Sequence, residues 1–167
     1  MASLIYKNRT IPIAWIVGAG RKGHFDVEFH IELLKILKQI LPAGIQVTVI
    51  GDGEFDGVNF LETIDEYGWS FVVRAAKNAK FTQHGNEIDL PKKLTPGERR
   101  SWVNVEFTNE YYGPVMVAAW RPDNNNEIIF LVSNNLTALE ATQNFKKSQK
   151  LKHFLSCGFL HLVYKYH

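Results

Sequence analysis

The first 17 positions hold two largely apolar runs, and from Val27 the pattern changes to a helical period. Two β-branched or aromatic runs flank a Lys-Asn-Arg turn near the N-terminus, which predicts a β-hairpin. From Val27 to Leu41, apolar residues recur every three or four positions, which predicts an amphipathic helix. Asp26 is a candidate N-cap, and Pro42 with Gly44 ends the pattern.

The following 30 residues predict a strand, a helix and a second strand. The apolar run at residues 47–50 is typical of a buried strand, and a helix follows from Asp56, its predicted N-cap, to Gly68. Residues 70–74 form the next strand. Strands joined through a helix favour a parallel pair with both faces covered. Asp52 then lies at the carboxyl end of a strand, where open α/β sheets bind ligands.

Residues 81–135 change to alternating strands and turns, which we call the β section. In the run Trp-Val-Asn-Val-Glu-Phe, Val103, Val105 and Phe107 alternate with polar residues, which predicts a strand with these three residues on one side. A turn is expected near Gly113-Pro114, and another in Pro-Asp-Asn-Asn-Asn, between further apolar runs. This stretch therefore predicts an antiparallel insertion in an α/β unit.

The length of 167 residues suits about one domain with a sizeable core. Its expected parts are residues 1–80, the first part of the core; residues 81–135, the inserted β section; and residues 136–167, a C-terminal helix and tail. The helix is predicted from Thr137 to about Ser156. No apolar run approaches the ~20 residues of a membrane span, so no membrane partner is expected.

Charge and cysteine content narrow the function classes only slightly. Nineteen basic and 17 acidic residues give a net charge of +2, too small to indicate a nucleic-acid partner. The basic residues are uneven, however, because residues 146–152 hold four lysines and no acid. That run fits either a solvated helix face or a polyanion contact. The single cysteine, Cys157, excludes an internal disulfide and a zinc site of several cysteines.

The segment VTVIGDGEFDG, residues 47–57, interleaves three acids with glycines. Asp52, Glu54 and Asp56 match the start of a calcium-binding loop, apart from the glutamate at the third position. The match fails farther on, because the twelfth position is Thr63 and a strand precedes the loop instead of a helix. Glu54 is better explained as part of a solvated turn, and Asp56 as a helix cap.

A dinucleotide site is the enzymatic alternative. Gly18, Gly20 and Gly23 fit the pattern G-x-G-x-x-G, follow a predicted strand and precede a helix. The acid that would bind the ribose is expected about 20 residues later, whereas Asp52 lies well beyond that spacing. The helix also begins several residues too late, so this alternative is disfavoured but stays open.

Four motifs in series carry a more specific resemblance: NRTIPIAW, RKGH, VTVIGDGEFDG and GWSFVVRAAKN. In this order and spacing they resemble the catalytic core of DDE-type insertion-sequence transposases, in the group with a β domain inserted before the final catalytic helix. The resemblance spans about residues 3–155. It implies a ribonuclease-H-like α/β fold, with a mixed sheet, flanking helices and an inserted antiparallel β section. It also implies DNA transposition in a prokaryotic cytoplasm, in association with the nucleoid.

The same resemblance assigns roles to individual residues. Three carboxylates in the family hold two divalent metal ions, usually magnesium, for phosphoryl transfer to and from DNA. Asp52 matches the second of these acids, so it is implied as a catalytic residue and a metal ligand. Lys22, His24, Arg74 and Lys77 would lie near DNA, where cations neutralise phosphates.

The catalytic triad, however, is incomplete in this sequence. The first acid of the family lies on a strand before the hairpin with which this sequence begins. The third acid belongs to a Tyr-x2-Arg-x3-Glu-x6-Lys signature, and the four places here hold Phe145, Ser148, Lys152 and Phe159. Glu140 is on the same predicted helix but about 18 Å of rise from position 152, which makes it a poor substitute.

We therefore expect a truncated, diverged relative of the transposases that has lost strand transfer. The alternative is a DNA-binding or interaction protein without catalysis, associating with an intact relative or with itself. Without the first strand of the family, an edge of the central sheet is expected to be exposed, which would favour aggregation or pairing with another chain.

Overall fold

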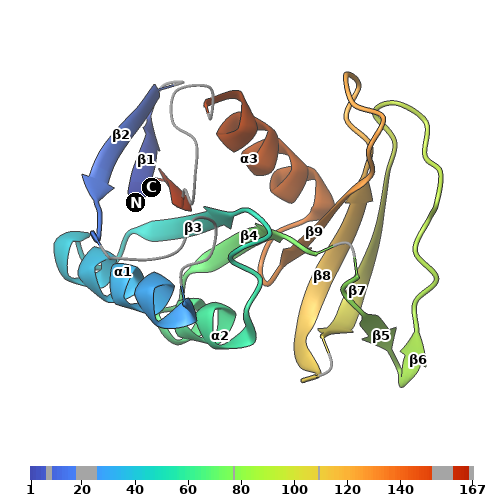
Figure 1. Ribbon diagram of the computed structural model, residues 1–167, viewed down its shortest axis with the longest axis horizontal. Helices are drawn as coiled ribbons and strands as arrows, with labels where there is room; N and C mark the ends of the chain where they lie inside the picture. The colour runs from blue at the N-terminus through green and yellow to red at the C-terminus, as the bar shows by residue number, and fades with distance from the viewer. Residues whose placement is uncertain (7–8, 18–25, 77, 109, 152–159, 166–167) are drawn as a thin grey trace.

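The computed structural model describes residues 1–6, 9–17, 26–76, 78–108, 110–151 and 160–165. Over these residues the chain forms one 10-stranded mixed sheet and three helices. Helices α1 and α2 cover one face of the sheet and α3 covers the other (Figure 1). The predicted fold class is confirmed, since this α/β architecture is compatible with a ribonuclease-H-like fold.

The first half of the chain forms the predicted hairpin and the strand-helix-strand unit. Its elements are β1 (Ala2–Tyr6), β2 (Arg9–Ala14), α1 (Val27–Ile40), β3 (Gln46–Gly51), α2 (Val58–Glu66) and β4 (Ser70–Arg74). Strands β1 and β2 pair antiparallel, and β3 and β4 pair parallel. The apolar sides of α1 and α2 pack on the sheet in one cluster with the inward residues of β3 and β4.

The second half extends the same sheet beyond β4. Its elements are β5 (Phe81–Gln83), β6 (Asn86–Glu87), β7 (Arg99–Phe107), β8 (Tyr112–Trp120), β9 (Ile129–Ser133), α3 (Ala138–Leu151) and β10 (Leu160–Lys165). The strand order across the sheet is β2-β1-β10-β3-β4-β9-β8-β7-β5-β6. Strand β9 pairs antiparallel with β4, so the β section continues the sheet (Figure 1).

Two details of the β section differ from the sequence prediction. The turn lies between β7 and β8, where Thr108 and Tyr111 have positive φ angles of 67° and 55°. Gly113 belongs to β8, and a Cβ there would lie only 2.6 Å from the carbonyl oxygen of Val105, so close strand packing explains this glycine. Val103 is 58% exposed because the β7–β8 register shifts between residues 102 and 105.

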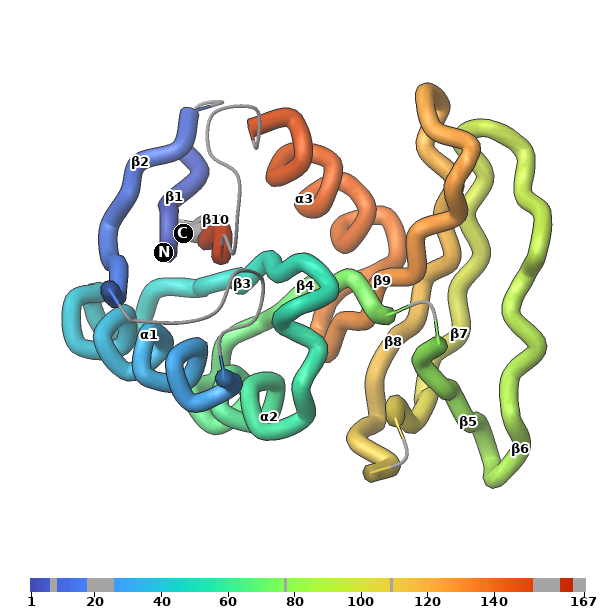
Figure 2. Tube along the Cα trace, viewed as in Figure 1, coloured from blue at the N-terminus to red at the C-terminus, as the bar shows by residue number. Residues whose placement is uncertain are grey.

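The predicted exposed edge of the central sheet is wrong within the described part of the chain. Strand β10 lies between β1 and β3, parallel to β1 and antiparallel to β3. Figure 2 shows this last segment between the N-terminal hairpin and β3. Leu160 and Leu162 of β10 are almost completely buried in the cluster that α1 and α2 cover. Strand β10 is therefore a central element of the sheet.

Candidate functional site

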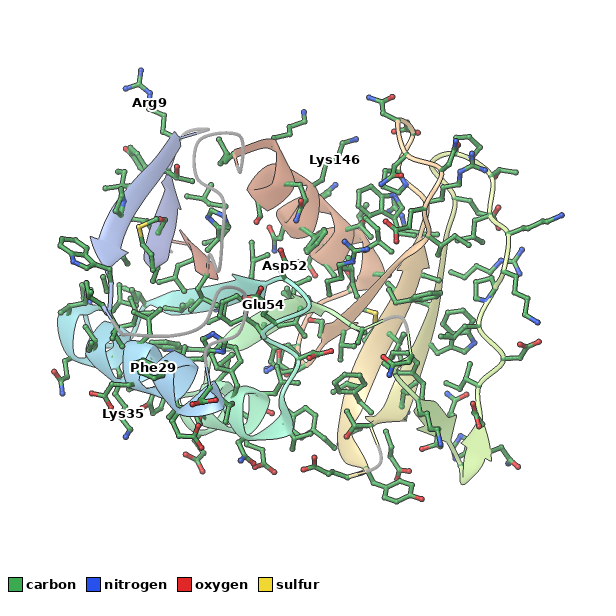
Figure 3. The ribbon with its side chains drawn as sticks, in the orientation of Figure 1. Arg9, Phe29, Lys35, Asp52, Glu54 and Lys146 are labelled. Atoms are coloured by element: carbon green, nitrogen blue, oxygen red, sulfur yellow. The ribbon has the colours of Figure 1, made fainter. Side chains whose placement is uncertain are left out.

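Asp52 lies where the sequence predicted it, directly after β3 (Figure 3). Strands β3 and β4 are parallel, with Gly51 in register with Val73. The carboxyl ends of the two strands therefore meet at one edge of the sheet, and Arg74, the last residue of β4, lies beside Asp52 at this edge. The structure thus brings together two of the residues predicted for the site.

A tight turn fixes the backbone around Asp52. The amide of Phe55 donates to the carbonyl oxygen of Asp52 at 3.0 Å, and the amide of Gly53 donates to its Oδ1 at 2.5 Å. Phe55 is fully buried, with its ring centroid 4.4 Å from that of His30. A Cβ at Gly51 would lie 2.6 Å from the Cβ of Phe55, so only glycine lets this ring pack under the end of β3.

Arg74 forms an ion pair that sequence reasoning missed. Its Nη2 lies 3.2 Å from Oε1 of Glu127, and both side chains are partly exposed. Glu127 comes shortly before β9, which pairs with β4 so that Leu131 is in register with Arg74. This contact depends on a pairing between strands far apart in the sequence, so no local pattern could reveal it. Part of the positive charge at this edge is therefore balanced within the protein.

The other two acids of the segment have structural surroundings. Glu54 is exposed in the turn, as expected. Asp56 is not the N-cap of α2, because Gly57 occupies that position. Instead, the Asp56 carboxylate accepts a hydrogen bond from the amide of Ala76 at 3.0 Å, which ties the turn after β3 to the segment after β4. Burial raises the pKa of Asp56, and the hydrogen bond from Ala76 offsets part of this effect.

The third catalytic acid of the family is expected on the last helix, but the acid that α3 contains, Glu140, lies in its first turn. Oε2 of Glu140 accepts hydrogen bonds from the amide and hydroxyl of Thr137, and the amide of Glu140 donates to that hydroxyl oxygen. This is a capping box, which satisfies the backbone at the start of the helix. Phe145 and Ser148, at two places of the expected signature, are buried against the sheet. Glu140 therefore has a structural explanation.

The remaining predicted site residues, Lys22, His24 and Lys77, lie outside the described residues, as does the glycine pattern between residues 18 and 23. Within the described ranges, no three acidic, histidine or cysteine side chains are grouped so as to hold a metal ion. The described edge offers the Asp52 carboxylate beside the end of β4, where the Glu127 carboxylate is already paired with Arg74. This donor set does not fit a pair of divalent metal ions, which needs several negative oxygen ligands.

A comparison with protein-family models matches residues 2–156 to the transposase DDE domain. The chain belongs to the transposase DDE domain family. Comparisons with curated proteins and with solved structures gave no match. The family match runs from β1 past the end of α3, so it includes Asp52, Arg74 and the whole β section.

Membership confirms the resemblance found in the sequence and brings two general expectations with it. Proteins of the transposase DDE family act on DNA, and they normally use divalent metal ions for that chemistry. DNA is accordingly the macromolecular partner that the family implies. None of the helices in the described part of the chain is long and apolar enough to cross a bilayer.

Proposed function

We propose that this chain is a DNA-binding member of the transposase DDE family that does not cleave or transfer DNA strands by itself. The observation that carries the proposal is the composition of the edge at which β3 and β4 end. Asp52 lies there next to the end of β4, where Arg74 is paired with Glu127, and no three acidic, histidine or cysteine side chains are grouped among the described residues as a metal-dependent nuclease would need.

The chemistry of hard cations supports this proposal. Magnesium prefers six oxygen ligands in nearly ideal octahedral geometry and binds proteins through carboxylates. One oxygen of Asp52 already accepts a hydrogen bond from Gly53, and no group of three metal-binding side chains exists among the described residues. We therefore expect at most weak magnesium binding at Asp52.

Binding to DNA does not require the metal-holding carboxylates that cleavage requires. Phosphates are held by cations with little geometric demand, and such binding weakens steeply as salt rises. Arg74 presents part of its guanidinium to solvent at the end of β4, and the Glu127 carboxylate competes with phosphate for it. DNA binding would also associate the chain with the nucleoid in a prokaryotic cell.

A plasmid-nicking assay tests the catalytic half of the proposal. Supercoiled DNA is incubated with the protein and either magnesium or manganese, and relaxed product is measured for the wild type, Asp52→Ala and Glu54→Gln. We expect all three to show the same background, since the carboxylates of the described residues are not grouped so as to hold a metal pair. Glu54 is the matched control because it is an exposed acid in the same turn. Nicking that disappears only in Asp52→Ala would overturn the proposal.

A further inference from the structure

Helix α3 has a basic outer side that the Asp52 site does not explain. Its inner side packs against the sheet through Ala141, Thr142, Phe145 and Ser148. The exposed positions between residues 143 and 150 are a glutamine and three lysines: Gln143, Lys146, Lys147 and Lys150. The sequence after Glu140 contains no aspartate or glutamate. The outer side of this helix is therefore positively charged without acids of its own.

A second group of cations lines a hollow of about 620 Å³ in the β section, where the one acid among the described lining residues, Glu98, is paired with Arg100 at 3.0 Å. Arg121 is fixed within it, since Nη1 donates to the carbonyl oxygen of Leu94 at 2.8 Å and Nη2 donates to Oδ1 of Asn126 at 2.9 Å. Lys92 and Lys93 are exposed on the same hollow. Arg121 thus holds the wall in place, while the two lysines present their ammonium groups to solvent.

The two cationic groups meet at Asp123, in the turn between β8 and β9. Nζ of Lys146 lies 3.7 Å from Oδ2 of Asp123. On the other side, a Cβ at Gly97 would lie 2.8 Å from Oδ1 of the same carboxylate, so the chain that follows Lys92 and Lys93 contacts it directly. Figure 3 shows Lys146 on the side of α3 toward this turn. The helix and the hollow therefore form one surface, which we call the basic surface.

We propose that the basic surface, formed by Lys92, Lys93, Lys146, Lys147 and Lys150, binds the phosphate backbone of duplex DNA. The inference rests on the proposed function, DNA binding, and assigns it a second set of residues outside the Asp52 edge. Binding of this kind neutralises phosphates by lysine and carries no base information.

Two comparisons favour DNA over the alternatives. Interfaces between proteins are depleted in lysine and enriched in aromatic residues, whereas the exposed stretch of α3 between residues 143 and 150 is lysine and glutamine. An ordinary solvated helix mixes both charges, as α1 does: Nζ of its Lys35 lies 3.5 Å from Oε2 of Glu32. Figure 3 shows Lys35 on the opposite side of the molecule from Lys146.

Salt-dependent binding tests this assignment. The full chain is titrated against a 30-base-pair duplex of arbitrary sequence by fluorescence anisotropy, between about 50 and 200 mM salt. The variants are Lys92→Gln with Lys93→Gln, Lys147→Gln with Lys150→Gln, and Lys35→Gln as the control. Glutamine at exposed positions changes stability by only about 0.5 kcal/mol or less, and circular dichroism verifies that each variant is folded. Lys146 is left intact because it pairs with Asp123.

Each lysine that contacts a phosphate contributes about 0.9 to the slope of log K against log salt concentration. We expect each double variant to flatten that slope by about 1.8 and the Lys35 variant to leave it unchanged. A wild type that does not bind the duplex even at low salt would contradict the proposed function itself. A wild type that binds, with double variants indistinguishable from the Lys35 control, would overturn only the basic surface. Equal affinity for polyglutamate of matched charge would also overturn the assignment to DNA.

Discussion

Replacing Leu162 with alanine measures how much the fold depends on β10. Leu162 is 1% exposed and packs in the cluster beneath α1 and α2, in the middle of the sheet. Removing a buried leucine side chain to Cβ loses its transfer free energy and leaves a cavity, a combined cost of about 2–5 kcal/mol. The neighbouring strands β1 and β3 are both paired with β10, so the site has little room to collapse. We therefore expect a loss near the middle of this range, about 3 kcal/mol.

Leu139 provides the matched control, because Leu139→Ala makes the same chemical change at a side chain that is 48% exposed on α3. Its expected cost is within about 0.5 kcal/mol, since surface substitutions leave little cavity and alanine favours helix. Urea unfolding followed by circular dichroism gives both free energies, and for a chain of this size 3 kcal/mol lowers the melting temperature by roughly 6–12 °C. Equal stability of the two variants would show that β10 is not a central strand.

Three further predictions concern the turn after β3 and the start of β8. Gly51→Ala is expected to lower the free energy of unfolding in urea by about 1–3 kcal/mol, because the new Cβ would lie 2.6 Å from the Cβ of Phe55. Gly53→Ala is the control and should be tolerated, because the nearest atom to its new Cβ is 3.8 Å away. Burial raises the pKa of Asp56 above 3.8, so protonation stabilises the fold and this contribution is lost as pH rises through the raised pKa. Asp56→Asn should therefore gain stability relative to the wild type as pH rises from 3.8 through the raised pKa of Asp56; a constant difference would contradict this. Burial also raises the pKa of Tyr112 above 10.0, so melting temperature should fall above pH 10 more steeply in the wild type than in Tyr112→Phe.

Local patterns predicted the elements whose apolar period is strong. Residues 70–74 form β4 as expected, and α1 begins at Val27 after Asp26, although the Asp26 side chain makes no capping hydrogen bond. Where the pattern failed, a contact with a distant segment decided the outcome. Val103 alternates like a core residue, but a register shift against β8 turns it outward. The β10 strand could not be placed, because its partners lie at the other end of the chain.

The candidate site was predictable to a similar extent. Asp52 could be placed at the ligand-binding edge of the sheet. Parallel strands joined through a helix almost always connect in a right-handed sense, and their carboxyl ends meet at that edge. The roles of Glu127 and Asp56 could not be found in the same way. Glu127 reaches Arg74 through the β4–β9 pairing, and Asp56 bonds to the amide of Ala76, 20 residues later. Both contacts exist only once the sheet has assembled.

The place of β10 also sets the order in which this protein can fold. Ala2 pairs with Leu160, and β10 lies between β1 and β3, so the hairpin β1–β2 is not joined to β3 within the described part of the sheet until residues 160–165 have left the ribosome. Contacts between residues so far apart slow folding, because a long loop must close before they form. Until then, β1 and β3 each present an unsatisfied strand edge, the kind of surface that chaperones shield in nascent chains. Production of soluble protein should therefore respond to chaperone supply and to lower temperature during synthesis.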